Sequence, residues 1–308
     1  MAITARVLTL FALTSALGCF AAAADTQTTP PPAPNPNPSA ILVLGGDGMK
    51  HNAHGSLGTS ADGLTFESKG KTTKVAATSL EKVSVGSNER ETGGLPVTAA
   101  KMAIPYGGGR VVSLFAHEKY DTLTVEYRDD NGGYHGMLFN VPKGQADSLQ
   151  TAIGQIAAKT PAPPMASTDK NNSGWAIEVE PVNPGDTAVS PEFLVATYEH
   201  LIEELEKSHK YVAVLRGGDS NAAKYGKLLV LKTDVQKFVH GNEEARAVTT
   251  VKGWTKLAVK MHLQTSDGRD VLDKDLESNV RFYGNNLRAT KTLASSMVNT
   301  ASTAPMPQ

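Results

Sequence analysis

Cysteine is almost absent from this chain of 308 residues, which contains a single one, Cys19. Cys19 lies inside an apolar N-terminal segment, so its fate depends on how that segment is processed. If the chain is cut after Ala24, the mature protein has no cysteine. Disulfides, thiol nucleophiles and cysteine metal sites are then excluded.

Signatures of common enzymes are also missing. The sequence has no GxSxG and no HExxH motif. The glycines at 45–48 follow a short apolar run, but no GxxxxGK[ST] pattern follows them, which favours a turn over a phosphate loop. The acidic residues at 267–277 lack the twelve-residue spacing of a calcium loop. We therefore predict no cofactor and no metal site.

An excess of charge of one sign is lacking too, with 30 basic and 31 acidic residues. Nucleic-acid-binding proteins usually carry a basic excess, so this balance argues against nucleic acid as a partner.

The N-terminus has the pattern of a secretory signal peptide. Arg6 precedes an apolar stretch at 7–24, and the alanines before Asp25 fit a cleavage site. The alternative is lipidation at Cys19, because Ala16-Leu17-Gly18-Cys19 is a variant of the bacterial lipoprotein motif. Either way we expect an exported protein of the periplasm or outer cell envelope.

Proline-rich stretches divide the rest of the chain. The predicted organisation is a signal peptide (1–24), a linker (25–40), a β domain with a C-terminal helix (41–159), a second linker (160–174), a mixed α/β domain (175–301) and a disordered tail (302–308).

The first domain shows a succession of short alternating strands, followed by an amphipathic helix at 145–158. A polar loop is expected at 86–94, and further strands at 102–106 and 110–115. The segments GSLGTSADGLTFES and VAATSLEKVSVGS resemble the first strands of bacterial pleckstrin-homology-like domains, over about Met49–Lys159. Such domains often bind phosphoinositides or peptides. Lys69, Lys71 and Lys74 form a small basic cluster that could contact anionic head groups, although a solvated turn is the simpler interpretation.

The second domain begins with a strand at 175–179 and a helix at 191–208, with Ser190 as N-cap and Pro191 at N1. A strand at 211–215 would complete a crossover. Long strands at 228–238, 257–264 and 271–283 and a helix at 286–301 follow. The glutamates of the first helix are expected to be solvated: Glu199, Glu203, Glu204 and Glu206.

The stretch KLLVLKTDVQKFVHGNEEARAVTTVKGWTKLAVKMHLQTSDGRDVL, with the helix after it, resembles an uncharacterised bacterial domain family of envelope proteins and lipoproteins. The resemblance covers about Trp175–Ala301 and implies an envelope location. It draws attention to Asn242 and Arg246. A structural role is the first interpretation: Asn242 suits a tight turn and Arg246 could clamp the loop. Anion or partner binding is the second.

Histidines show no metal-binding pattern. His51 and His54 are expected to be exposed, and a strand would point them to opposite faces. The other histidines are likewise predicted to lie at the surface: His117, His135, His200, His209, His240 and His262.

The predicted fold class is α+β. It comprises a small bent β-sheet or partial barrel closed by a C-terminal helix, then a mixed-sheet α/β domain with two helices. The leading functional hypothesis is a non-enzymatic exported protein that binds or scaffolds an envelope protein or glycan. The alternatives are a secreted hydrolase whose site is not visible in sequence, and a membrane-surface binding module that associates through lipidation or the lysine cluster.

Overall fold

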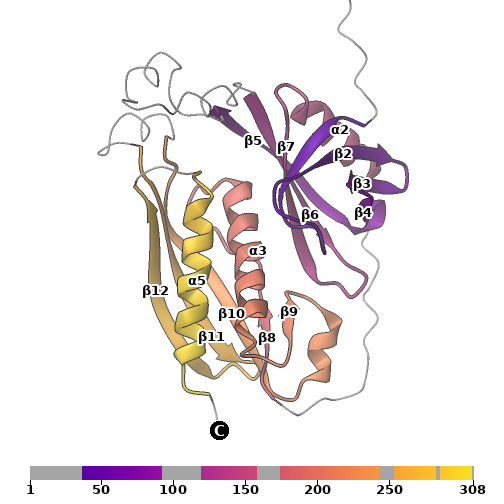
Figure 1. Cartoon of the computed structure of the whole chain (residues 1–308). Coiled ribbons are helices and arrows are strands. Elements are labelled where there is room, and N and C mark those ends of the chain that lie inside the picture. Colours follow the sequence, from indigo (N-terminus) through magenta and orange to yellow (C-terminus); the bar gives the residue numbers. More distant parts are fainter. Residues whose placement is uncertain (1–36, 92–118, 158–173, 243–252, 282–284, 307–308) are drawn as a thin grey trace, which may run out of the picture. The chain divides into compact units, whose positions relative to one another are not determined.

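A computed structural model describes residues 37–91, 119–157, 174–242, 253–281 and 285–306. Its first sheet has seven antiparallel strands in the order β4-β3-β2-β1-β7-β6-β5. The short 3-10 helix η1 (Ala77–Ser79) joins β4 to β5 (Figure 1). The strands are β1 (Ser39–Leu44), β2 (Ala53–Ser60), β3 (Gly63–Ser68), β4 (Lys71–Ala76), β5 (Leu80–Glu91), β6 (Lys119–Arg128) and β7 (Tyr134–Pro142).

Helix α2 (Ala146–Ile156) packs against one face of this sheet. Its buried residues include Leu149 and Ile153, which join Phe66, Phe139 and other strand residues in one apolar cluster. The periodicity that predicted an amphipathic helix at this place was therefore sound. In the described residues the sheet does not close into a barrel, since β4 and β5 form its two edges.

The second sheet is mixed, with the order β12-β11-β10-β8-β9. Strand β8 pairs in parallel with both β9 and β10, while β10, β11 and β12 are antiparallel neighbours. Helix α3 (Pro191–Ser208) is the crossover between β8 and β9. The strands are β8 (Ala176–Val179), β9 (Val214–Arg216), β10 (Leu228–Val239), β11 (Thr255–Thr265) and β12 (Asp270–Val280).

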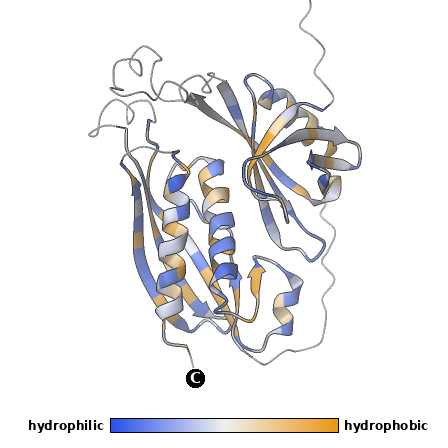
Figure 2. Cartoon of the chain, in the orientation of Figure 1, coloured by the Kyte–Doolittle hydropathy of each residue, from blue (hydrophilic) through white to orange (hydrophobic). Residues whose placement is uncertain are grey.

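Helix α5 (Arg288–Thr303) lies beside α3 over this sheet (Figure 1). The side chains of β11 alternate between buried and half-buried along its whole length, as the sequence predicts for a strand with one face on the core. Edge strand β12 is hydrophilic over most of its length (Figure 2), and Asp273, Asp275 and Glu277 are exposed there. The predicted α+β fold class is confirmed.

Several predicted boundaries differ from the structure. Strand β5 runs on to Glu91 through part of the expected loop, and β9 begins only at Val214. Helix α5 extends to Thr303, and Ala304 is buried, so the chain is ordered into the predicted tail. Ser190 precedes α3 as predicted, but its hydroxyl makes no capping hydrogen bond. The expected strands at 102–106 and 110–115 lie outside the described residues.

Helix α3 is buried on nearly all sides, which the sequence did not reveal. Tyr198, Leu201 and Leu205 pack in the core of the second sheet, whereas Phe193 and Val195 pack with Leu44 and Leu138 of the first. The expectation that Glu199 is solvated was wrong, because this glutamate is only 3% exposed. Of the other three glutamates, Glu206 is exposed, whereas Glu203 and Glu204 are half-buried. Because α3 packs against both sheets, it has too little solvent-exposed surface to keep all its charged side chains in water.

A glycine on β7 permits this packing. A Cβ atom built at Gly136 would lie 2.2 Å from Cγ1 of Val195, so any larger residue would push α3 away from the sheet. No described helix is both long and apolar enough to cross a membrane. The described residues from 37 onwards form one compact unit that contains both sheets.

We expect Gly136→Ala to lower the free energy of unfolding by about 1–3 kcal/mol, because the added methyl group overpacks the contact with α3. Gly154→Ala is the matched control. It lies within α2 and a Cβ there meets nothing within 4 Å, so helix propensity should make it neutral or stabilising by about 0.5–1 kcal/mol. Urea titration measures both. Equal effects of the two substitutions would show that α3 does not pack closely on β7.

Candidate functional site

The turn between β6 and β7 is docked on the segment between β9 and the 3-10 helix η3 (Ser220–Lys224). The amide of Tyr134 donates to the carbonyl of Gly217 at 3.1 Å, and the amide of Ser220 donates to the carbonyl of Asn131 at 2.9 Å. Arg128 adds a side-chain bond, since its Nη1 donates to the same Gly217 carbonyl at 3.1 Å. Backbone pairing thus joins the first sheet to the second.

A buried ion pair lies beneath this turn. Nη1 and Nη2 of Arg216 donate to the two carboxylate oxygens of Glu199 at 2.8 and 2.9 Å. Oε1 of Glu199 also accepts from the amide of Gly136 at 2.8 Å, and Nη1 of Arg216 donates to the carbonyl of Tyr134 at 3.1 Å. The side chain of Arg216 is 16% exposed and that of Glu199 is 4% exposed. Burial disfavours the charged guanidinium and alone would lower its pKa. The neighbouring carboxylate of Glu199 has the larger opposite effect, so the pKa of Arg216 is raised above its ordinary value.

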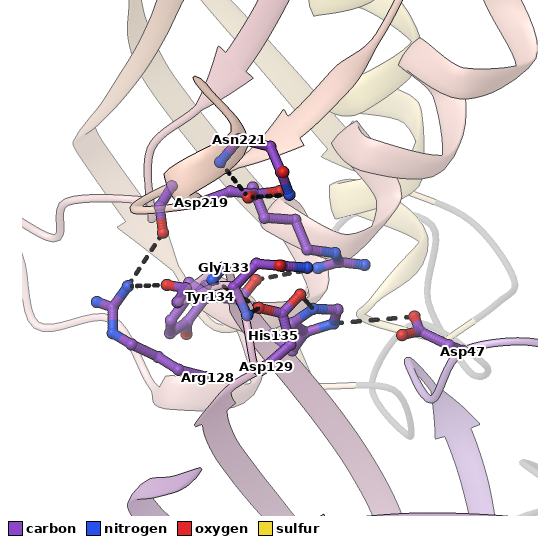
Figure 3. A network of polar contacts seen from close by, with 12 residues as sticks. Asp47, Arg128, Asp129, Gly133, Tyr134, His135, Asp219 and Asn221 are labelled. Atoms are coloured by element: carbon purple, nitrogen blue, oxygen red, sulfur yellow. Dashed lines mark hydrogen bonds and ion pairs between the residues drawn. The ribbon is translucent and has the colours of Figure 1, made fainter. Parts of the chain in front are cut away.

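The same turn holds a buried histidine between carboxylates (Figure 3). Nε2 of His135 lies 3.1 Å from Oδ2 of Asp129, and Nδ1 lies 3.8 Å from Oδ1 of Asp47. The ring stacks on Tyr127 with centroids 5.0 Å apart. Burial alone would raise the pKa of Asp129, but hydrogen bonds from His135 and the Gly133 amide lower it below its ordinary value. Asp129 therefore acts as a fixed anion that shapes the turn.

Beside this network lies a groove of about 590 Å³. One wall is formed by consecutive residues of β4, from Thr72 to Ala76, together with residues of β3. The other wall is formed by Tyr127–Asp130, with Asp47 at its end. Strand β4 is an edge strand of the sheet, and an unbroken run of five of its residues lines the groove, as expected where a groove follows a strand edge. The groove thus runs along the edge of β4.

More acidic than basic side chains are exposed in the lining of the groove. Asp62 and Asp130 are exposed, and the side chain of Asp47 is 76% exposed. The charge of Arg128 is offset by Glu81, whose Oε1 accepts from Nε at 2.6 Å. Lys74 is then the remaining cation among the described lining residues. The groove is chemically suited to polar ligands with positive charge.

The structure separates the lysines that the sequence grouped together. Lys69 lies at the turn between β3 and β4 with a positive φ of 47°. Nζ of Lys71 donates to the carbonyl of Gly48 at 2.8 Å, whereas Lys74 lines the groove. Lys71 and Lys74 are three residues apart on one strand, so their side chains point to opposite faces. A role of the three lysines at a membrane surface stays a prediction.

The second pair of predicted residues is only half described. Asn242 is exposed, and Arg246 lies outside the described residues. The neighbouring carbonyl of Gly241 accepts from Nδ2 of Asn286 at 3.1 Å, and Oδ1 of Asn286 accepts from the hydroxyl of Thr255 at 2.6 Å. Asn286 thus ties this loop to the start of α5. Cys19, the signal peptide and residues 160–173 of the second linker also lie outside the described part of the chain.

Sequence reasoning missed His135, Glu199 and Arg216. His135 and His200 were expected at the surface, but they are only 4% and 9% exposed. Burial lowers the pKa of His200 to about 4, which keeps its ring neutral. His51 and His54 are both exposed as expected, and the ring of His51 is also hydrogen-bonded to Glu203 on α3. Contacts between the sheets bury the side chains of His135, Glu199 and Arg216. No local pattern in the sequence predicts such contacts.

Within the described residues, no cluster of three or more His, Cys, Asp or Glu side chains could hold a metal ion. The charged groups of the network instead bind one another and the backbone.

Comparison with known proteins gives distant likenesses to solved structures. No family model matches the chain, and no curated protein matches it. Among solved structures, the PelC dodecamer from Paraburkholderia phytofirmans matches with a TM-score of 0.31 at 14% identity, covering 45% of this chain and 91% of that chain. A protein of family DUF330 from Xanthomonas campestris matches with a TM-score of 0.27 at 12% identity, covering 46% and 88%. Likenesses this weak do not assign the chain to a family. They add no support for the pleckstrin-homology-like interpretation, which stays a prediction.

We expect Arg216→Met to lower the free energy of unfolding by about 3–5 kcal/mol, because it leaves the carboxylate of Glu199 buried without its partner. Adding Glu199→Gln should recover much of this loss, since the amide oxygen still accepts from Gly136. Denaturant titration of the single and double variants measures the coupling. Lys207→Met is the control: Lys207 pairs with Glu204 at the surface with 61% of its side chain exposed, and its loss should cost less than about 1 kcal/mol. Additive effects of the two core substitutions would contradict the buried pair.

Proposed function

We propose that this chain is an exported, non-enzymatic protein that binds a component of the cell envelope through the groove along β4. The groove is the observation that carries the proposal. It has room for a ligand of substantial size, and its walls come from strands that are far apart in sequence. A concave site with a few fixed polar groups is the usual form of a binding site.

The groups around the groove support binding more than catalysis. Asp129 accepts from two backbone amides and contacts His135, while Arg128 is held by Glu81 and by backbone carbonyls. A general base needs a position from which it can reach a substrate proton. Asp129 and His135, which together have suitable chemistry for a general base, are instead occupied in holding the β6–β7 turn. No observation favours the hydrolase alternative over this one.

The envelope location rests on the sequence alone, through the apolar segment at 7–24 and the alanines that follow it. Export places the groove where envelope proteins and glycans are its available partners. The sequence gives no basic excess that would favour a nucleic acid.

Site-specific cross-linking tests the proposal, because under either predicted fate of Cys19 an added cysteine is the only free thiol. Thr72→Cys lines the groove, and Asp270→Cys at the start of β12 is an exposed control. Each variant is labelled with benzophenone maleimide and irradiated with envelope fractions. We expect a discrete adduct from Thr72→Cys alone, which disappears when Asp62→Lys and Asp130→Lys are added.

Adducts of equal yield and pattern from both positions would contradict a binding role for the groove. Retention of the full-length chain inside the cell, with no shortening of its N-terminus by mass spectrometry, would contradict the proposed export.

A further inference from the structure

The free edge of β4 defines which kind of ligand the groove can take. Strand β4 pairs with β3, and it has no second strand neighbour among the described residues. Its register with β3 places Gly63 opposite Ala76. The next pair outward, Asp62 and Ala77, is hydrogen-bonded, because the amide of Ala77 donates to the carbonyl of Asp62 at 2.9 Å.

Hydrogen-bonded pairs of an antiparallel ladder alternate with non-bonded pairs. The bonded pairs of β4 are therefore those of Val75 and Thr73, which direct their backbone groups toward β3. The residues between them direct their N–H and C=O groups the opposite way, toward the groove. These residues are Thr72, Lys74 and Ala76, and all three line it.

We propose that the groove holds an extended segment of a partner polypeptide, which adds as a further strand along β4 and places a basic side chain against the opposite wall. The inference rests on the proposed binding function of the groove and names its ligand class. Unpaired strand edges recognise peptides in this way, since the backbone supplies affinity and the side-chain surroundings supply selectivity.

The acidic residues of the groove favour a basic side chain in the bound segment. The wall facing β4 carries Asp130 and ends at Asp47, and Asp62 lies at the turn before β3. All three are exposed and could contact a lysine or arginine of the segment. An aromatic platform that would favour a glycan is not available in the described groove, because the one aromatic lining residue, Tyr127, is buried and stacked on His135.

A second copy of this chain is a poorer occupant of the edge. Two antiparallel β4 strands would bring Lys71 and Lys74 of one copy close to the same lysines of the other, and lysines on an edge strand discourage such pairing. Sedimentation distinguishes this case: a dimer that dissociates on Lys74→Pro substitution would overturn the proposal in favour of self-association.

Fluorescence anisotropy with synthetic peptides tests the proposal on the mature chain. The probes are labelled peptides of about eight residues that alternate Val and Lys, long enough to span the six residues of β4. One counterpart has Glu in place of Lys, and another has N-methyl groups on alternate amides. We expect the basic peptide to bind, and each counterpart to bind at least about tenfold more weakly.

Two substitutions at Lys74 distinguish the contribution of the backbone to peptide binding from that of the side chain. Lys74→Pro removes an outward N–H without touching the ladder to β3, whereas Lys74→Thr removes the charge and keeps the N–H. Binding of the basic peptide should weaken at least about tenfold in the first variant and be unchanged or stronger in the second. Asp62→Asn with Asp130→Asn should bring the affinities for the basic and acidic peptides within about threefold of each other.

Equal binding of the methylated and unmethylated peptides would overturn strand addition, and this comparison uses the unaltered protein. Absence of saturable binding up to about 1 mM basic peptide would overturn it as well. In either case, cross-linking of Thr72→Cys to an envelope glycan would leave the proposed function intact. Absence of cross-links together with peptide binding in vitro would instead count against the envelope role.

Discussion

The bidentate ion pair between Glu199 and Arg216 is the contact on which the arrangement of the two sheets depends. Its carboxylate comes from the crossover helix, its guanidinium from the end of β9, and both bind the backbone of β7. A buried pair is costly to desolvate, and breaking it costs more than it contributes when intact. Such a pair disfavours arrangements in which α3 moves away from β7, because separation would leave a buried charge without its partner.

The ligand groove follows from that arrangement. The pair and the turn contacts fix Arg128 and Asp129 at the end of β6, and these residues form one wall. The other wall is an edge strand whose one strand neighbour in the described part of the chain is β3. A rigid wall facing a strand edge suits a ligand that supplies its own backbone hydrogen bonds. Fixed charges in the wall can then select among such ligands without the cost of ordering a loop.

Local patterns in the sequence predicted most of the elements. Ser190 and Pro191 indicated the start of α3, and the strand predicted at 257–264 corresponds to β11. The burial of Glu199 could not be predicted, because it depends on a second sheet packing against the polar side of the helix. The groove could not be predicted either, since its walls are strands more than fifty residues apart, brought together by strand order.

Hydrogen exchange of the native protein tests most directly whether the ion pair unites the sheets. The amides of Gly136 and Tyr134 donate to Glu199 and Gly217 across the junction. If the pair holds both sheets in one cooperative unit, these amides exchange only by global unfolding, with the same free energy as the amides of Met261 and Leu263 in the centre of β11. Exchange of Gly136 and Tyr134 at a clearly lower free energy, with β11 still protected, would show that the sheets separate while folded and would contradict the account.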